Sequence, residues 1–232
     1  MKNFLFDLYG TLIDIKTDEN SAAFWQGVSK ILLQTEGRGK EIKERYASLC
    51  NAEKAKLPRL GEIDLLAVFR NLLCEYGQPA SRAEEFALQF RKLSLHRCRP
   101  FAGVKEMLSA LRERGAGVYL LSNAQACFTH AEITACGLAP YFHGILLSSE
   151  AGRKKPSPEF FKTAFSRFSL SPENCLYVGN DLFDDVGGAH AVGMKCAYIH
   201  SRQSGKYENA PEPDMRAKDR KHLARLLERE CL

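Results

Sequence analysis

Polar residues follow three short apolar runs of the sequence, at the point where each run ends. These polar clusters begin at Asp7, Ser122 and Gly179. They contain carboxylates, a hydroxyl and amides, groups that can act as a nucleophile, hold a cation or donate hydrogen bonds to an anion. If the runs are parallel strands of one sheet, their ends meet at one edge, where open α/β sheets bind ligands. The three clusters therefore predict one shared crevice.

The apolar runs that precede these clusters are continuous rather than alternating, which suits strands buried on both faces. Gly, Pro, Ser or Asn lies near each of them. The predicted strands cover residues 4–6, 118–121, 145–147, 176–178 and 197–199. They alternate with helical patterns, which predicts an α/β fold with a Rossmann-like parallel sheet and helices on both faces.

The stretch between about residues 15 and 98 breaks this alternation and contains no convincing strand. Its patterns predict four helices, near residues 21–34, 40–54, 64–76 and 82–96. Pro100 and Gly103 mark the return to the alternating pattern. The sequence thus predicts a core domain at residues 1–14 and 99–232, with an all-helical cap domain inserted at residues 15–98.

The first cluster is the string Asp7 to Asp14, which reads DLYGTLID. A carboxylate placed directly after an apolar strand is held rigidly and is partly desolvated. Gly10 allows a tight turn beside a ligand. Backbone N–H groups in such a turn can cradle a phosphate, and Thr11 can tie the loop back through its hydroxyl. The string favours a functional carboxylate at Asp7 over a simple strand-end cap.

This string resembles the first motif of the haloacid dehalogenase superfamily, in which an apolar strand precedes D-x-D-G-T or the variant D-x-Y-G-T. Three further motifs of that family follow in the required order. They are Ser122 after a strand, Lys155 before Pro156, and the acidic loop at residues 179–185. The resemblance covers the whole chain and implies a hydrolase with a helical cap over its active site.

The resemblance also implies a role for each motif residue. Asp7 attacks the substrate and forms a covalent intermediate, while Lys155 neutralises charge that develops in the transition state. Lys154 competes for the second role, but Lys155 directly precedes the proline, as in the family motif. The residues expected to bind the phosphoryl group are Gly10, Thr11, Ser122, Asn123 and Lys155.

A magnesium ion is implied as cofactor. The Asp7 carboxylate, the Tyr9 backbone carbonyl and the fourth motif are expected to hold it, because magnesium takes oxygen ligands. The ion reduces the repulsion between an anionic nucleophile and an anionic phosphate. The fourth motif opens with Asn180 where the family usually has Asp. Asp181 or Asp185 is expected to supply the missing charge, and the choice among these three side chains stays open.

Tyr9 stands where most family phosphatases carry the Asp that protonates the leaving group. A tyrosine hydroxyl has an ordinary pKa of about 10 and cannot serve as both acid and base there. We therefore expect Tyr9 to contribute its backbone carbonyl and to pack. Loss of a general acid typically removes about 10²–10⁴-fold in rate. It matters least for leaving groups that depart without a proton, which predicts a preference for acyl or aryl phosphates.

Tyr9 also raises a second function, because the metal-independent 2-haloacid dehalogenases of the same superfamily carry Tyr at this place. Those enzymes have Trp-Arg early in the cap, whereas Gln26 follows Trp25 here, and Phe161 replaces a family tyrosine. Their fourth motif is also poor in acid, unlike this one. A binding module with a degenerate site is a third hypothesis. The residues favour a phosphatase that acts on a small phosphorylated metabolite.

The overall composition is that of an ordinary globular protein, with 45% hydrophobic residues and a net charge of +5. No apolar run approaches the length of about 18 residues that a membrane helix needs, and no secretory pattern is present. Eight scattered cysteines without C-x-x-C pairs suggest reduced thiols. We expect a cytoplasmic monomer or homodimer without a nucleic-acid or membrane partner. The candidate cap residues for substrate contact are Trp25, Arg45, Asn51 and Lys54.

Overall fold

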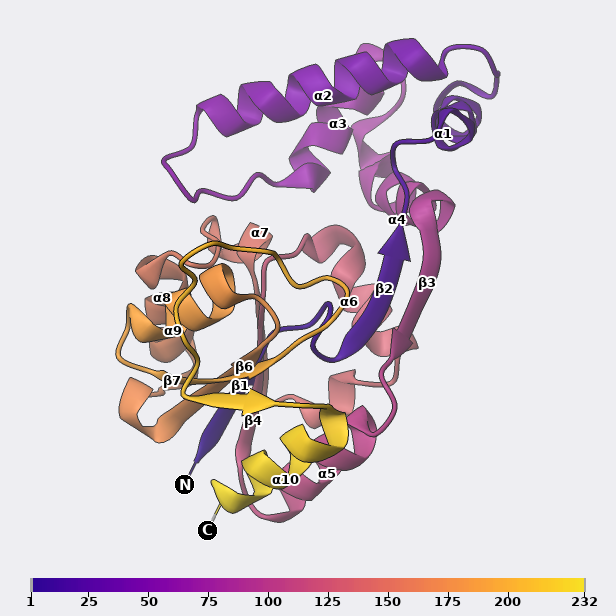
Figure 1. Cartoon of the computed structure of the whole chain (residues 1–232). Helices are drawn as coiled ribbons and strands as arrows, with labels where there is room; N and C mark the ends of the chain where they lie inside the picture. Colours follow the sequence, from indigo (N-terminus) through magenta and orange to yellow (C-terminus); the bar gives the residue numbers. More distant parts are fainter. Residues whose placement is uncertain (1, 232) are drawn as a thin grey trace.

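The computed structural model describes residues 2–231, and its centre is a six-stranded parallel sheet (Figure 1). The strand order is β5-β4-β1-β6-β7-β8. The strands are β1 (Asn3–Phe6), β4 (Gly117–Ser122), β5 (Gly144–Leu147), β6 (Cys175–Gly179), β7 (Lys195–Ile199) and β8 (Met215–Ala217). The five predicted strands and the α/β fold class are confirmed. Strand β8 was not predicted, because its three residues form no apolar run.

Strand β1 lies at the middle of the sheet, and its register aligns the ends of its neighbours. Phe6 pairs with Leu120 of β4 and with Val178 of β6. All three strands run in the same direction, so the residues that follow them leave the sheet at one edge. The predicted convergence of the three polar clusters is a direct consequence of this register.

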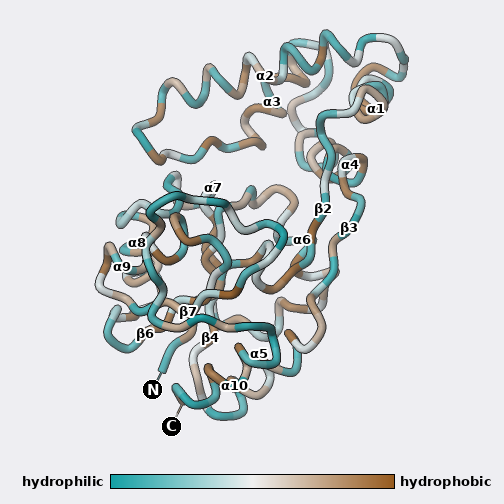
Figure 2. The backbone as a smooth tube through the Cα atoms, in the orientation of Figure 1, coloured by the Kyte–Doolittle hydropathy of each residue, from teal (hydrophilic) through white to brown (hydrophobic). Residues whose placement is uncertain are grey.

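Side chains on β1 alternate between the two faces of the sheet, as the pleat requires. Phe4 and Phe6 belong to one buried cluster, whereas Leu5 belongs to the other. The first cluster includes residues from α5 (Val104–Glu113) and α10 (Arg220–Arg229). The second cluster includes residues from α8 (Pro158–Phe168) and α9 (Gly188–His190). The hydrophobic residues therefore gather in the strands and on the helix faces that cover them (Figure 2).

Four α-helices lie between residues 15 and 98, as predicted. They are α1 (Ala22–Leu33), α2 (Gly39–Ala55), α3 (Leu65–Glu75) and α4 (Ala83–Ser94). They surround an aromatic core in which Phe69 and Phe90 lie 5.1 Å apart between ring centroids. Figure 1 shows these helices grouped on one side of the sheet domain. We call residues 15–98 the cap, and these exact limits stay a prediction.

An antiparallel pair of strands connects the four helices to the core. It consists of β2 (Ile13–Thr17) and β3 (Leu95–Pro100), with Ile15 opposite Cys98. The sequence predicted helix as far as His96, whereas α4 ends at Ser94. The strands form because Ile15 and Cys98 pack against the core cluster, a long-range contact that local periodicity does not reveal. We call this pair the stem.

The cap also contacts the core away from the stem. The Lys154 amide donates to the Leu60 carbonyl at 3.1 Å, and Gln125 bonds both the Ile63 carbonyl and the Leu65 amide. Gln125 directly precedes α6 (Ala126–Ala135), and Lys154 follows α7 (Ser148–Ala151). These bonds, one between backbones and two from the Gln125 side chain, fix the position of the loop before α3 over the core.

Across residues 2–231, no helix is long and apolar enough to cross a membrane. All eight cysteines are free thiols, as predicted. The expected cytoplasmic location and monomeric or homodimeric state stay predictions.

Candidate active site

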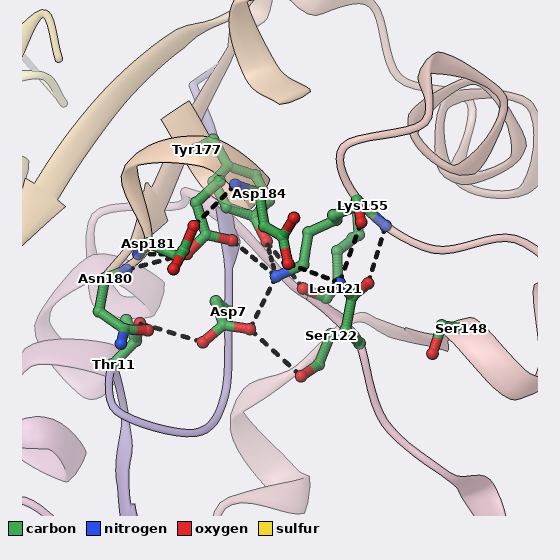
Figure 3. A network of polar contacts seen from close by, with 12 residues as sticks. Asp7, Thr11, Leu121, Ser122, Ser148, Lys155, Tyr177, Asn180, Asp181 and Asp184 are labelled. Carbon is green, nitrogen blue, oxygen red and sulfur yellow. Dashed lines mark hydrogen bonds and ion pairs between the residues drawn. The ribbon is translucent and has the colours of Figure 1, made fainter. Parts of the chain in front are cut away.

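Asp7 lies at the end of β1 with only 7% of its surface exposed. One carboxylate oxygen, Oδ1, accepts from Lys155 Nζ at 2.7 Å and from Ser122 Oγ at 3.2 Å. The other oxygen, Oδ2, lies 3.2 Å from Thr11 Oγ1, which donates to it (Figure 3). The structure therefore brings together four residues that sequence reasoning placed in one site, and it orients the carboxylate from both sides.

Lys155 is almost completely buried between two carboxylates. Its ammonium group donates to Asp7 Oδ1, to Asp185 Oδ1 at 2.6 Å and to Tyr177 Oη at 2.8 Å. Burial alone would lower the pKa of Lys155, but Asp185 and Asp7 outweigh it and raise the pKa well above its usual value. The lysine is therefore a fixed cation beside Asp7. Tyr177 was missed, because a tyrosine in a buried strand looks like a core residue.

Asn123 is occupied by protein partners rather than directed at open space. Its Nδ2 donates to the Lys155 carbonyl and to Asp184 Oδ2, both at 3.1 Å, and its Oδ1 accepts from the Lys155 amide at 2.8 Å. These bonds fix the backbone of the lysine. The predicted hydrogen bond from Asn123 to a phosphoryl group therefore competes with the bonds that position Lys155.

The fourth motif forms a turn of π-helix, η4 (Leu182–Gly187), in which the acidic residues have different partners. Asp181 accepts from the amides of Phe183 and Asp184 and, at 2.6 Å, from the Tyr207 hydroxyl. Asp185 accepts from Lys155 and from the Asn180 and Asp181 amides at 2.9 Å each. Both carboxylates, which the sequence suggested as metal ligands, are thus held by protein donors.

Asp184 lines the cavity beside Asp7 and was not among the predicted ligands. Burial raises its pKa. Burial also raises the pKa of Asp185, to about 6, against the opposing effect of Lys155. Three buried or half-buried carboxylates thus face one lysine, and this excess of negative charge favours a cation or protons nearby.

The amide of Asn180 points toward the nucleophile. Its nearer end lies 3.1 Å from the Tyr9 carbonyl oxygen and 3.2 Å from Asp7 Oδ2. The amide oxygen and nitrogen can exchange places without other movement. With nitrogen at the nearer end, Asn180 donates to both oxygens and accepts from Ser201. With oxygen there, it faces the oxygens of Tyr9 and Asp7 and accepts from Thr11 Oγ1 at 3.0 Å, while Asn180 Nδ2 donates to Ser201 at 3.1 Å.

This oxygen set fits magnesium. Ligands at about 2.1 Å in octahedral geometry lie about 3.0 Å from their neighbours, close to the spacing around Asn180. Among residues 2–231, no group of three or more His, Cys, Asp or Glu side chains is arranged to hold a metal. A site here therefore depends on the carbonyl of Tyr9 and the amide of Asn180. Gly10 makes room, since a Cβ there would lie 2.5 Å from Asn180 Nδ2, at a φ of +87°.

The side chain of Tyr9 turns toward the cap. Its hydroxyl makes a short hydrogen bond to Glu132 Oε2 and lies 3.0 Å from Thr129 Oγ1. Glu132 Oε1 in turn accepts from Arg91 Nε of cap helix α4 at 2.6 Å. Burial first, and then the Glu132 carboxylate, raise the pKa of Tyr9 well above its usual value. We call Tyr9, Glu132 and Arg91 the cap–core network.

The candidate site surrounds a cavity of about 160 Å³, which we call the catalytic cavity. Its lining residues are Asp7, Tyr9, Ser122, Asn123, Lys155, Asn180, Asp181, Asp184, Asp185 and Gln203. All of them lie outside the cap. Trp25 is instead buried in the cap core, and Arg45 pairs with Glu75 on the surface. Asn51 and Lys54 are exposed on α2 and do not line the cavity.

Curated relatives of this chain include phosphatases. The chain is 32% identical over 154 residues to a phosphoserine phosphatase of Thermus thermophilus, which covers 66% of this chain and 60% of the relative. It is 32% identical over 111 residues to a glyceraldehyde 3-phosphate phosphatase of Methanopyrus kandleri, which covers 48% and 46%. The chain thus matches about half to three-fifths of the length of these relatives.

Solved structures share the fold over almost the whole chain. A 2-haloacid dehalogenase from Pseudomonas syringae superposes with a TM-score of 0.70 at 22% identity and covers 99% of this chain and 100% of its own. A HAD phosphatase from Thermococcus onnurineus gives 0.62 at 19% identity and covers 98% of each chain. The family model of haloacid dehalogenase-like hydrolases matches residues 1–193, and this chain therefore belongs to that family.

Proposed function

We propose that the protein is a magnesium-dependent phosphatase that hydrolyses a small phosphorylated metabolite through an aspartyl-phosphate at Asp7. The observation that carries the proposal is the setting of Asp7, which lies between a buried cation, Lys155, and a hydroxyl donor, Ser122, at the floor of the catalytic cavity. Membership of the hydrolase family and the phosphatase relatives support it.

In the proposed reaction a carboxylate oxygen of Asp7 attacks phosphorus, and the bond between phosphorus and the leaving oxygen breaks. Water then attacks the aspartyl-phosphate, which releases inorganic phosphate and restores Asp7. Lys155 stabilises the negative charge on the phosphoryl oxygens as it grows, and Ser122 donates a hydrogen bond at the same place. Both groups are already fixed by the protein, so little reorganisation is needed.

Magnesium would be held by Asp7 Oδ2, the Tyr9 carbonyl and the Asn180 amide oxygen. When bound, it supplies positive charge that lowers the repulsion between the nucleophile and the substrate. Asp181 and Asp185 keep their protein donors in this arrangement. Asn180 brings no charge, so the affinity for magnesium should be lower than in a site with Asp there.

The Tyr9 hydroxyl supports the expected preference for activated phosphates. It donates to Glu132, so its proton is not free for the leaving group. A general acid at this place is therefore missing, and the rate at which the leaving group departs from phosphorus depends on the stability of its anion. Measuring kcat/KM for phosphate esters over a range of leaving-group pKa tests this point. We expect a steep decline as that pKa rises, and a flat dependence would contradict it.

The main test is hydrolysis of p-nitrophenyl phosphate by the full chain with magnesium and with EDTA. We expect metal-dependent activity that Asp7→Asn abolishes and that Asp18→Asn, in the exposed loop before α1, leaves intact. Chloride release from 2-chloropropionate without metal would instead support the dehalogenase. Absence of both activities in a protein that folds would favour a binding module.

Magnesium binding is tested separately by calorimetry, without turnover. Asn180→Asp adds a charged ligand and should tighten magnesium binding by about tenfold, whereas Asn180→Ala should abolish it. If neither substitution changes the affinity, the ion is held elsewhere.

A further inference from the structure

A second cavity, of about 290 Å³, lies where the stem meets the core. We call it the arginine pocket. Its charged lining residues are Asp14, Arg97, Arg99, Arg202 and Arg220. Gln203 lines both this pocket and the catalytic cavity, but none of the proposed catalytic residues lines it. The proposed reaction therefore does not account for the charged residues of this pocket.

Three separate parts of the chain bring these arginines together. Arg97 and Arg99 lie two residues apart on β3, so their side chains leave the same face of the stem. Arg220 is the first residue of α10, at the end of that helix which carries partial positive charge. Arg202 lies on the loop after β7. Convergence from the stem, a helix and a loop gives a positively charged site that no single segment creates.

The protein does not balance the charge of the pocket. Asp14 is the only carboxylate among the lining residues that the structure describes, and it faces four arginines. Its Oδ2 lies 2.8 Å from Arg97 Nε and 3.9 Å from Arg99 Nε. The lining therefore carries three positive charges more than negative ones.

The guanidinium groups are also short of acceptors. Nε of Arg220 is buried without a hydrogen-bond partner, whereas the buried Nε of Arg97 has only the Asp14 carboxylate that it shares with Arg99. The guanidinium of Arg220 lies 3.3 Å from the ring centre of Phe101, and its Nη2 donates to the Gly10 carbonyl at 2.9 Å. Burial lowers the pKa of Arg220, and Asp14 only partly opposes this effect. Buried donors without acceptors are costly, and an anion in the pocket would relieve that cost.

We propose that the arginine pocket binds a doubly charged phosphoryl group, as a second anion site distinct from the catalytic cavity. Planar guanidinium groups match the oxygens of a phosphate in pairs, and several of them can share one dianion. The size of the pocket suits a small molecule. Arg220 already covers one face of the Phe101 ring, so that face is not open to a nucleic-acid base.

The site is coupled to the catalytic loop through Arg220, which holds the carbonyl of Gly10 three residues after Asp7. It is also coupled to the cap through Arg97 and Arg99 on the stem. A bound anion would therefore contact β3, which leads out of the cap, and would reach the loop that carries Asp7 through Arg220. The proposal does not depend on the reaction proposed above, because it concerns binding alone.

The test measures binding of inorganic phosphate by calorimetry to the full chain and to Arg99→Gln/Arg202→Gln. Arg202 is exposed, and 72% of the Arg99 side chain is exposed, so the double variant should fold. We expect two phosphate sites in the wild type, one of which weakens by about tenfold or more in the variant. Arg70→Gln/Arg229→Gln removes the same charge from exposed positions elsewhere and should keep both sites.

Two results would overturn the proposal. One is a double variant that binds phosphate with wild-type stoichiometry and affinity. The other is a wild type with a single phosphate site that Ser122→Ala weakens, since this site would be the catalytic cavity. Methylphosphonate distinguishes the source of the ligand. Equal affinity for methylphosphonate and phosphate indicates recognition of the phosphoryl group alone, and tighter phosphonate binding indicates an organic phosphate as the natural ligand.

Discussion

Two buried networks of charged and polar groups begin two residues apart on the same loop, and they join different parts of the molecule. Asp7 leads to Lys155, Asp185 and Tyr177, which all belong to the core. Tyr9 leads through Glu132 to Arg91 on cap helix α4. We call the first the catalytic network, and the second is the cap–core network defined above.

The two networks differ in their balance of charge. The catalytic network has one lysine against two carboxylates, with Asp184 nearby, and is short of positive charge. The cap–core network has one arginine, one carboxylate and a neutral phenol, so its positive and negative charges are equal. An unbalanced buried network favours a bound cation, whereas a balanced one holds parts of a structure together. The comparison therefore separates a network that suits the proposed chemistry from a network that attaches the cap to the core.

The largest expected effect comes from Lys155→Met, which leaves two buried carboxylates without their cation. Removing one partner of a buried ion pair costs about 3–5 kcal/mol of unfolding free energy. Loss of the charge that stabilises the transition state should also lower kcat/KM by about 10²–10³-fold. Urea unfolding and hydrolysis of p-nitrophenyl phosphate measure the two effects.

Lys154→Met is the matched control, because Lys154 does not line the catalytic cavity and its ammonium group has no ion pair among residues 2–231. It should change stability by less than about 0.5 kcal/mol. If Lys154→Met and Lys155→Met lost equal stability and activity, the buried ion pairs of Lys155 would contribute nothing measurable. The proposed difference between the two networks would then be wrong.

The catalytic network was largely predictable and the cap–core network was not. Asp7, Ser122 and Lys155 belong to ordered motifs, and Asp7 and Ser122 lie at the ends of parallel strands whose pairing brings them together. Glu132 lies on a helix whose sequence contains no motif that marks it as a functional residue. Its partner Arg91 lies 41 residues earlier, in the cap. Their contact depends on how the cap docks, which is a property of tertiary packing.

The fourth motif shows a finer limit of the same kind. The sequence placed several acidic residues near the site without deciding among them. In the structure a π-helical turn points Asp185 at Lys155, uses Asp181 to cap the turn and leaves Asp184 beside the cavity. Extending a helical turn by one residue redirects every side chain after it, and nothing in the local residue types specifies that change.

The second prediction concerns the bond between cap and core. Arg91→Met keeps most of the aliphatic packing but removes the charge, and leaves Glu132 buried alone. We expect a loss of about 2–4 kcal/mol of unfolding free energy, slightly less than for Lys155→Met. A double-mutant cycle with Glu132→Gln should give a coupling of about 1–3 kcal/mol.

The activity of Arg91→Met and Lys155→Met gives a second difference between the two networks. Because Arg91 touches neither the cavity nor Asp7, kcat/KM should fall by less than about tenfold, which corresponds to about 1.4 kcal/mol. A drop as large as that of Lys155→Met would show that the cap–core network takes part in the chemistry.

The third prediction is a smaller change with a characteristic pH dependence. Tyr9→Phe removes the hydrogen bond to Glu132 and should cost about 1.5–2 kcal/mol at pH 7. The folded-state pKa of Tyr9 is raised, so its protonated form is favoured by folding. The stability that it contributes is fully present below about pH 10 and is lost as the pH rises toward the folded-state pKa. Wild type should therefore lose more stability than Tyr9→Phe between pH 10 and 11, and parallel curves would contradict this.

The smallest effect is expected at Glu19, a partly exposed neighbour of the cap–core network. Glu19 lies 3.9 Å from Arg91, and 38% of its side chain is exposed, so Glu19→Gln should change stability by only a few tenths of a kcal/mol. Burial raises the pKa of Glu19 despite the opposing effect of Arg91. A raised carboxyl pKa means that stability falls as the pH rises from the ordinary value through the folded-state value. Between pH 4 and 7, the unfolding free energy of Glu19→Gln should therefore fall less than that of the wild type. If Glu19→Gln instead lowered the unfolding free energy as much as Arg91→Met, the ion pair with Glu19 would be the main contribution of Arg91. The ion pair between Arg91 and Glu132 would then not be what attaches the cap to the core.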